Sequence, residues 1–210
     1  MSSKAASSNR VERSKVVLAS ASRTRASLLS HAGVPCIADP AGIDEDEIKR
    51  SLRGDGASAA RAAEALAELK ALKVSSRHGG ALVIGADQML ECDGTWFDKP
   101  ADRAQARAQL SALRGRRHRL VAAVVAMRDG IRLWHHIDHA DLSMRHFSDA
   151  FLDAYLDRAG DSVCASVGAY QLEGLGAQLF SSIEGDHFTI LGLPLLPLLD
   201  FLRAQKVLPT

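Results

Sequence analysis

One carboxylate in this sequence is marked by its position after an apolar segment. The run Val83-Ile84-Gly85-Ala86 is apolar and ends in small residues, and Asp87 follows it directly. This pattern predicts a strand that stops on a turn, and catalytic groups collect at the carboxyl ends of strands in open α/β sheets. The simpler alternative is that Asp87 only caps the turn. The segment Asp98-Lys99-Pro100 favours chemistry, because one short hairpin can return Lys99 to the carboxylate. A carboxylate among cations suits metal-phosphate chemistry.

A second group of residues is suited to binding an anion. Ser20 and Ser22 follow the strand-like run Lys15–Ala19 and precede a helical stretch, with Ser22 as its predicted N-cap. The first backbone N–H groups of a helix lack internal partners and attract negative charge. Arg25, one turn into this helix, adds a forked cation for phosphate oxygens. The alternative is an ordinary helix that begins with serine and carries an exposed arginine.

Two charged segments admit both a structural and a functional interpretation. Lys70 lies near the end of the helical segment Ala57–Ser76, where pairing in solvent with a nearby glutamate is the simpler explanation. Glu45 and Glu47 belong to an acidic stretch that is typical of a solvated loop. A carboxylate from this stretch opposite Asp87 would complete a magnesium site.

Other familiar chemical motifs are not found. On an extended chain, the four-residue separation of His135 and His139 is too long for one metal ion, so we interpret them and His136 as exposed edge-strand residues. The sequence contains no G-x-S-x-G elbow, Walker loop or G-x-G-x-x-G fingerprint. The three cysteines are scattered and odd in number, which fits neither a disulfide framework nor a zinc knuckle, and we expect them to be buried.

Composition narrows the class of protein. With 210 residues, of which 47% are hydrophobic, the chain can bury a substantial core. The polar segment Met1–Ser14 predicts a disordered, solvated tail without a secretory signal, and residues 15–210 predict a single domain in the cytoplasm. A formal net charge of +1 does not indicate a nucleic-acid partner, and no run is long enough to cross a membrane.

The elements that must position these residues alternate between strands and helices, with hairpins between some of the strands. This pattern predicts an α/β fold with a mixed sheet. The expected strands are Lys15–Ala19, Cys36–Ala38, Ala81–Gly85, the hairpin Glu91–Phe97 with its turn at Cys92-Asp93-Gly94, His118–Met127, Ile131–Met144 and Leu179–Ile183. The expected helices are Ser22–Ala32, Ala57–Ser76, Arg103–Leu113, Ser148–Arg158 with Ser148 as its N-cap, and a closing helix after Pro194.

Taken in order, these pieces resemble the Maf family of nucleoside triphosphate pyrophosphatases, over roughly Val16 to Leu202. Each motif is weak alone, and their ordered recurrence makes the resemblance specific. The motifs are Leu18-Ala19-Ser20-Ala21-Ser22 with Arg25, Asp44-Glu45, Leu66-Ala67 with Lys70-Ala71, Gly85-Ala86-Asp87, Lys99-Pro100, Leu113-Arg114-Gly115 with His118, Gly168-Ala169-Tyr170 with Glu173-Gly174-Leu175-Gly176, and Gly192-Leu193-Pro194-Leu195.

The resemblance implies a twisted mixed sheet with flanking helices and two lobes around a cleft, as in the inosine triphosphatases, and often a homodimer. The implied reaction is attack of water on the α-phosphorus of a nucleoside triphosphate, with a divalent metal such as magnesium, manganese or cobalt. Asp87 matches the proton acceptor, and Glu45 matches the acidic residue near the metal. Arg25, Lys70 and Lys99 match the cations that handle phosphate.

Departures from the family pattern bear on the substrate. The chain has Arg23-Thr24-Arg25 where many members have Pro-Arg-Arg, and it has Gln88 and Glu173 where the thymidine/uridine triphosphate branch has Thr and Gln. Gln88 and Glu173 resemble the branch that acts on 7-methyl-GTP. A glutamate offers only acceptors, which complements the two donors of guanine, whereas a glutamine complements uracil or thymine. Thr24 stands where that branch often has an aromatic residue, which leaves a broader specificity open.

Two other functions remain open at this point. One is a pyrophosphatase of the dTTP/UTP type. The other is a nucleotide-binding regulator of cell division with incidental hydrolysis, since the family was named for an effect on septum formation.

Overall fold

The computed structural model describes residues 15–210, and the predicted tail Met1–Ser14 lies outside the described residues. Within them, seven strands form one sheet in the order β2-β1-β3-β5-β6-β7, with β4 paired to β3. β1 pairs in parallel with β2 and β3, and the remaining pairs are antiparallel, so the predicted mixed sheet is confirmed. The strands are β1 (Val16–Leu18), β2 (Cys36–Ala38), β3 (Leu82–Cys92), β4 (Thr95–Phe97), β5 (Arg117–Arg128), β6 (Ile131–Met144) and β7 (Phe180–Glu184).

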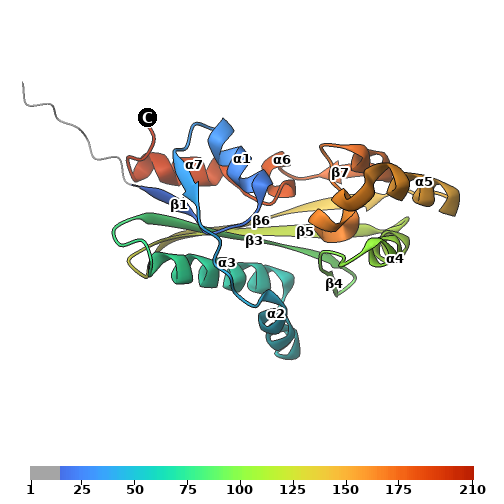
Figure 1. The fold of residues 1–210 in the computed structure, drawn as a ribbon, viewed down its shortest axis with the longest axis horizontal. Coiled ribbons are helices and arrows are strands. Elements are labelled where there is room, and N and C mark those ends of the chain that lie inside the picture. The colour runs from blue at the N-terminus through green and yellow to red at the C-terminus, as the bar shows by residue number, and fades with distance from the viewer. Residues whose placement is uncertain (1–14) are drawn as a thin grey trace, which may run out of the picture.

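Helices cover both faces of this sheet (Figure 1). The long helix α3 packs on one face, against β3 and β5, while α1, α6 and α7 lie on the other. Serine caps begin several helices as predicted, with Ser22 and Ser148 accepting from backbone N–H groups three residues on. The helices are α1 (Arg23–His31), α2 (Glu45–Gly54), α3 (Ala59–Ser75), α4 (Arg103–Leu113), α5 (Asp149–Ala159), α6 (His187–Ile190) and α7 (Leu195–Ala204).

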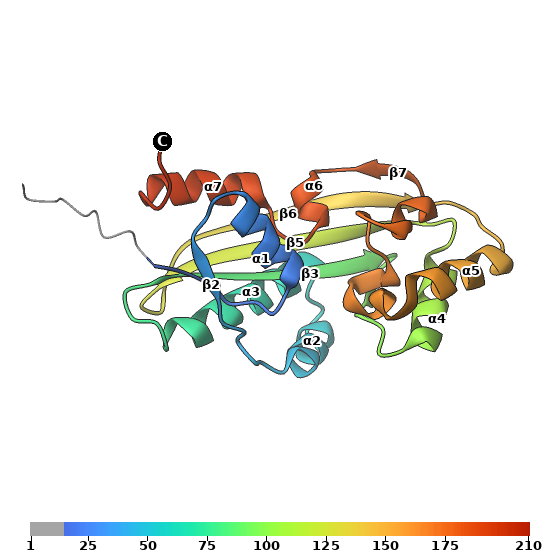
Figure 2. The same cartoon turned by 45° about the horizontal axis from the view of Figure 1, so that its top comes forward.

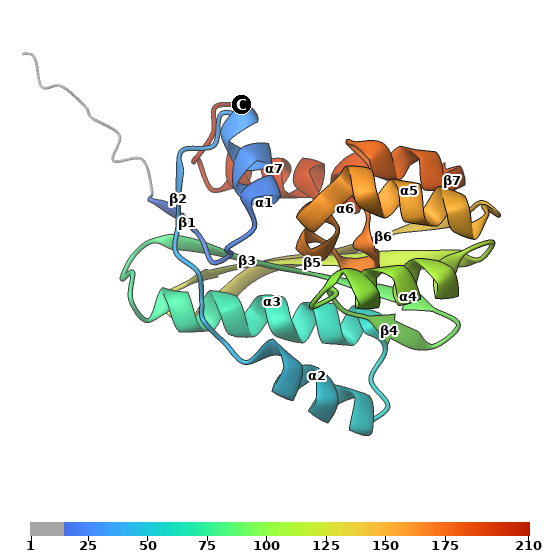
Figure 3. The ribbon, with the colours of Figure 1, turned by 45° about the vertical axis from the view of Figure 1, so that its right-hand side comes forward.

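A second lobe forms where the long strands β3, β5 and β6 continue beyond α3 (Figure 2). Its core combines apolar residues from the strand ends with α4, α5 and three 3₁₀ turns. These turns are η1 (Gly160–Ala165), η2 (Val167–Ala169) and η3 (Leu175–Leu179). Two separate apolar cores lie on the two faces at the other end of the sheet. The molecule therefore has two lobes that share β3, β5 and β6, whose residues enter the cores of both (Figure 3).

The strand before Asp87 is longer than predicted. β3 continues through Asp87 to Cys92, so the carboxylate lies within the strand and not at its end. The small residue Gly85 does not mark a turn: a Cβ there would lie 2.0 Å from the carbonyl oxygen of Ala67 in α3. A side chain at this position would push α3 off the sheet. The predicted turn was wrong because close helix packing and a turn both favour small residues.

The acidic stretch around Glu45 is a helix and not the predicted loop. Asp44 caps α2 by accepting a hydrogen bond from the backbone N–H of Glu47 at 3.0 Å. Three acidic residues occupy the first turn of α2, where the partial positive charge of the helix N-terminus stabilises them. A run of acidic residues therefore marks a helix start here, which the loop interpretation overlooked.

The cysteine prediction was only partly right. Cys92 is buried, whereas Cys36 and Cys164 are half-buried, and all three are free thiols. In the part of the chain that the structure describes, no helix is long and apolar enough to cross a membrane.

Candidate active site

Asp87 lies at the centre of a buried charge cluster. Lys70 Nζ is 2.6 Å from Asp87 Oδ1 and 2.7 Å from Glu45 Oε1. Asp87 is 4% exposed and Lys70 is 7% exposed, so solvent screens their interaction only weakly. The simpler explanation of Lys70, a solvated lysine paired within its own helix, is therefore wrong. Lys70 bridges carboxylates from two other elements.

Backbone packing explains why Lys70 reaches Asp87. Asp87 and Gly85 lie two residues apart on β3, so their side chains point to the same face of the sheet. Because Gly85 has no side chain, α3 lies directly against β3 at Ala67 and Ala71. Lys70 is adjacent to Ala71 on that helix. The absence of a side chain at Gly85 thus allows Lys70 to approach Asp87.

The second oxygen of Asp87 has a different environment. Asp87 Oδ2 is buried and has no hydrogen-bond partner among the described residues. An unpaired buried carboxylate oxygen is costly and therefore calls for an explanation. This oxygen is therefore free to accept a hydrogen bond from a water molecule or to bind a cation.

Arg25 is a buried cation that supports the wall of the site. Its Nε donates to the carbonyl of Gly192 at 2.8 Å, and Nη1 donates to the carbonyl of Ala86 at 2.9 Å and to Ser20 Oγ at 3.2 Å. Burial lowers the pKa of the Arg25 guanidinium, an effect that the negative charge of Asp87 opposes. Ser22 Oγ meanwhile accepts from the Arg25 backbone N–H at 3.3 Å. The predicted anion-binding segment, from Ser20 to Arg25, is therefore held in place by hydrogen bonds from the Arg25 side chain and from the Arg25 backbone N–H.

Two more lysines contribute positive charge. Lys99 remains accessible to solvent, but partial burial and then the nearby charge of Arg25 lower the pKa of its ammonium. Lys49 of α2 is 2.6 Å from Asp98, the residue before Lys99. Burial opposes the charge on Lys49, but the hydrogen bond and charge of Asp98 outweigh it and raise the pKa of the Lys49 ammonium.

A cleft of about 1140 Å³ between the two lobes connects these groups. Both lobes contribute to its walls, the first through α1, α2, α3 and β3 and the second through Ala165–Val167 and Tyr170–Glu173. All ten residues predicted as site residues line it. They are Ser20, Ser22, Thr24, Arg25, Glu45, Lys70, Asp87, Gln88, Lys99 and Glu173.

The three predicted specificity residues have different environments. Thr24 is half-buried in the first turn of α1, and Glu173 is exposed on the second lobe. The side-chain amide nitrogen of Gln88 donates to the carbonyls of Thr189 and Ile190, at 3.1 and 3.0 Å. Gln88 therefore fixes α6 to the sheet with its donor, whereas Glu173 has its carboxylate in the cleft region without a competing bond of this kind.

Lys49 is the site residue that sequence reasoning missed. Glu45 and Lys49 are four residues apart and so lie on one face of a helix. That spacing places Glu45 and Lys49 together only in a helix. Because the acidic stretch is interpreted from the sequence as a loop, the sequence does not identify Lys49.

The three histidines that drew a metal interpretation do not form a site. His135 and His139 are exposed, and His136 stacks on Trp134 with ring centroids 6.1 Å apart. Among the described residues there is no group of three or more histidine, cysteine, aspartate or glutamate side chains arranged to hold a metal ion.

Asp87 and Glu45 nevertheless fit a divalent cation that arrives with a phosphate. Magnesium is bound in such sites through one or two carboxylates, substrate oxygens and water, and not by a complete cage of protein ligands. Asp87 has one free oxygen, and Glu45 lies on the other side of the shared Lys70. The donor set suits a hard cation that needs substrate to complete its coordination.

A cleft between two lobes that is lined by five lysine and arginine side chains and has two central carboxylates is typical of α/β proteins that bind polyanionic ligands together with a divalent metal. The model of the Maf-like protein family matches residues 15–205 of this chain. The chain belongs to the Maf-like family.

Curated relatives cover nearly the same length. A protein of Paramagnetospirillum magneticum is 64% identical over 89% of this chain and 96% of its own length. A protein of Rhodospirillum rubrum is 58% identical over 92% of this chain and 96% of its own, and one of Granulibacter bethesdensis is 53% identical over 92% and 98%. Each of these relatives is named nucleoside triphosphate pyrophosphatase.

Proposed function

We propose that this protein is a nucleoside triphosphate pyrophosphatase that hydrolyses the bond between the α- and β-phosphates and clears modified nucleotides. Family membership and the names of its relatives support hydrolysis of phosphorus-containing anhydrides as the reaction class. The observation that carries the mechanism is Asp87, a residue that lines the cleft: one of its oxygens is held by Lys70, and the other is buried and has no partner among the described residues.

The proposed base is Asp87. Lys70 fixes Oδ1, so Oδ2 is the oxygen that accepts a proton from the attacking water. A general base must accept a hydrogen bond from the attacking water and hold that water in line with the reacting phosphorus, and a side chain fixed by a buried ion pair meets that need. Lys70 is thus a positioning residue for Asp87, and its second bond to Glu45 holds α2 against the same point.

The cations of the cleft receive the triphosphate. A triphosphate carries about four negative charges at neutral pH, and this charge repels an incoming nucleophile. Arg25 with the N-terminus of α1 and Lys99 approach the cleft from two segments, and Lys49 extends the positive surface. Their charges neutralise the phosphate oxygens and stabilise the pyrophosphate leaving group.

Pyrophosphatases of this family generally depend on a divalent metal, which would be held here by Asp87 and Glu45. When bound, the metal neutralises phosphate oxygens and increases the electrophilicity of the phosphorus. The choice among magnesium, manganese and cobalt is left to experiment.

We extend the proposal to the nucleobase, with a preference for 7-methyl-GTP. Glu173 lines the cleft from the second lobe. Its carboxylate accepts from the N1–H and 2-amino groups of guanine, and the positive charge of a 7-methylated ring strengthens both bonds. Since the amide donors of Gln88 are engaged by α6, the selectivity argument depends mainly on Glu173.

The test of the reaction is a nucleotide panel with magnesium or manganese. We expect equal amounts of nucleoside monophosphate and pyrophosphate, and we expect Asp87→Asn to lower kcat by about 10³-fold while the protein stays folded. Release of orthophosphate with a diphosphate product would refute the cleavage position. Unchanged turnover in Asp87→Asn would remove this residue from the mechanism.

The test of base selectivity is Glu173→Gln, compared with wild type on 7-methyl-GTP, GTP, UTP and dTTP. An amide offers both a donor and an acceptor, so the preference is expected to move toward uracil and thymine. An unchanged ranking of the four substrates would show that Glu173 does not recognise the base.

A further inference from the structure

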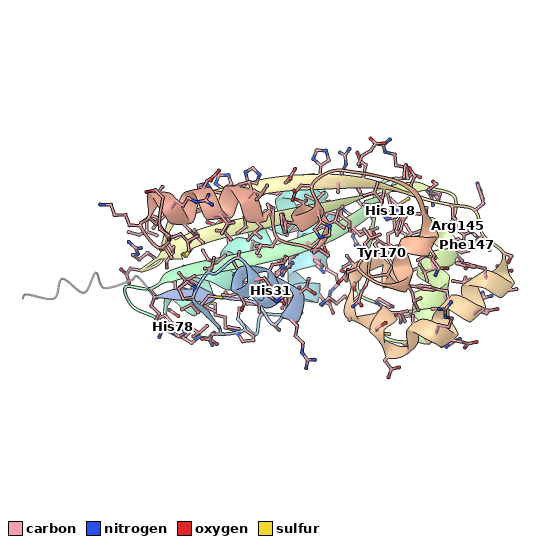
Figure 4. The ribbon with its side chains drawn as sticks, turned by 90° about the horizontal axis from the view of Figure 1, so that it is seen from above. His31, His78, His118, Arg145, Phe147 and Tyr170 are labelled. Atoms are coloured by element: carbon pink, nitrogen blue, oxygen red, sulfur yellow. The ribbon has the colours of Figure 1, made fainter. Side chains whose placement is uncertain are left out.

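A buried histidine–tyrosine pair lies behind the part of the cleft that contains Glu173. His118 of β5 is 2% exposed and Tyr170 is 5% exposed, and His118 Nε2 is 2.8 Å from Tyr170 Oη. Phe180 packs on both rings, with centroids 4.8 Å from Tyr170 and 5.8 Å from His118. Figure 4 shows the His118 and Tyr170 side chains together in the second lobe. Neither side chain takes part in the polyphosphate cluster around Asp87.

The backbone before Tyr170 is shaped to turn that side chain inward. Gly168 has φ +77° and Ala169 has φ +61°, two consecutive residues in the left-handed region. A Cβ at Gly168 would lie 2.5 Å from Leu90 Cδ1 and 2.7 Å from the Tyr170 ring. A left-handed alanine is unfavourable and persists only when its surroundings hold it. Tyr155 provides part of that restraint, since its hydroxyl donates to the Ala169 carbonyl at 3.1 Å.

The residues that follow Tyr170 fold as one compact loop. The Gly174 N–H donates to the carbonyl of Gln171 at 3.2 Å, and a Cβ at Gly176 would lie 2.5 Å from that same carbonyl oxygen. Glu173 lies inside this loop, and Tyr170 joins it to the buried core. A rotation of the Tyr170 anchor would therefore move Glu173 relative to the rest of the cleft.

We propose that the His118–Tyr170 pair positions the loop of residues 171–176 and thereby sets the nucleobase selectivity of the enzyme, a role that rests on the function proposed above for Glu173. His118 is a positioning residue and does not touch the substrate. The pair affects the position of the loop that would bind the nucleobase, and it does not affect the reaction at Asp87.

The first experiment measures the loop without any substrate. Tyr170→Phe removes one hydroxyl, and His118→Leu removes its partner. In both variants we expect backbone amide exchange over residues 171–176 to rise by about tenfold, with exchange in α3 unchanged. His118→Gln keeps a nitrogen in place of Nε2 and should restore slow exchange. Val125→Ala, a core substitution on the α3 side of β5, controls for a general loss of stability. Wild-type exchange in Tyr170→Phe and His118→Leu would overturn the proposal.

The second experiment measures selectivity. For His118→Leu, a change at a residue that does not line the cleft, we expect the ratio of kcat/KM for 7-methyl-GTP to that for UTP to fall by about tenfold, through KM, while kcat stays within about twofold. A fall in kcat with an unchanged ratio would overturn the proposal, since it would indicate a merely structural effect. If wild type itself shows no base preference, the proposed role of Glu173 fails, while the exchange experiment still decides whether the pair holds the loop.

Discussion

The two halves of the cleft hold their functional side chains by different physical means. On the Asp87 side, Lys70 lies between two carboxylates in a buried, charged cluster. On the Glu173 side, the support is a neutral pair, His118 and Tyr170, with the Phe180 ring packed on both. Charged side chains are suited to the polyanion and the cation that we propose for the first half. A neutral, rigid support is suited to the base discrimination proposed for the other half, because it adds no electrostatic attraction that would be the same for every nucleoside triphosphate.

Removing the central cation should have the largest effect. Lys70→Met leaves Asp87 and Glu45 without their shared partner, and an uncompensated buried charge costs about 3–5 kcal/mol of the free energy of unfolding. Turnover should also be lost, because Asp87 is no longer fixed. Denaturant unfolding and a pyrophosphate assay measure the two effects. The double variant Lys70→Met/Asp87→Asn should recover part of the stability and none of the activity. If the single variant were as stable as wild type, the cluster would not be a buried ion pair.

Lowering the pH should destabilise the half of the cleft that His118 and Tyr170 support. Burial lowers the pKa of His118 to about 4 against an ordinary value of 6.5, while the nearby charge of Asp141 opposes that shift. Between these two values the unfolded chain binds more protons than the folded protein, so stability falls as the pH drops from about 6.5 toward 4. The loss is about 3 kcal/mol by pH 4. Denaturant unfolding at pH 7 and pH 4.5 measures it. His118→Gln has no such titration, and an identical pH slope in that variant would contradict the assignment.

Separating α3 from β3 should disrupt the charged half alone. A Cβ at residue 85 would lie 2.0 Å from the Ala67 carbonyl oxygen, so Gly85→Ala should cost about 1–3 kcal/mol and move Lys70 away from Asp87. We expect reduced thermal stability and a large loss of kcat, with base selectivity retained. Gly54→Ala is the matched control, since nothing lies within 4 Å of a Cβ there. Equal activity in the two variants would refute the role of this contact.

The smallest effect is expected at the rim of the charged half. Lys49→Met removes the ion pair with Asp98 and one cation of the cleft, so KM for nucleoside triphosphates should rise by about five- to tenfold with little change in kcat. Steady-state kinetics at constant ionic strength measure this change. Arg107→Met, which breaks an exposed ion pair with Asp153 outside the cleft, should leave KM unchanged. The same KM in wild type and Lys49→Met would exclude this lysine from substrate binding.

Local sequence signals predicted much of the fold. Ser22 and Ser148 were identified as N-caps because a short side-chain acceptor before an apolar period has a local physical meaning. The turn at Asp93-Gly94 was predicted for a similar reason, and both residues have positive φ. Local signals failed where one residue type serves two purposes. Gly85 resembled a turn but serves helix packing, and the acids after Asp44 resembled a loop but begin a helix.

The sequence alone determined which residues are candidates: Asp87, Lys99, Arg25 and Glu173 follow from residue type and motif order. Tertiary structure decided how they are held, because burial and pairing depend on segments far apart in the chain. Lys70 is 17 residues from Asp87, and His118 is 52 from Tyr170. No periodicity or local propensity reports a contact over such separations. The packing of α3 on Gly85 and the left-handed turn before Tyr170 create those contacts, and only the folded chain shows them.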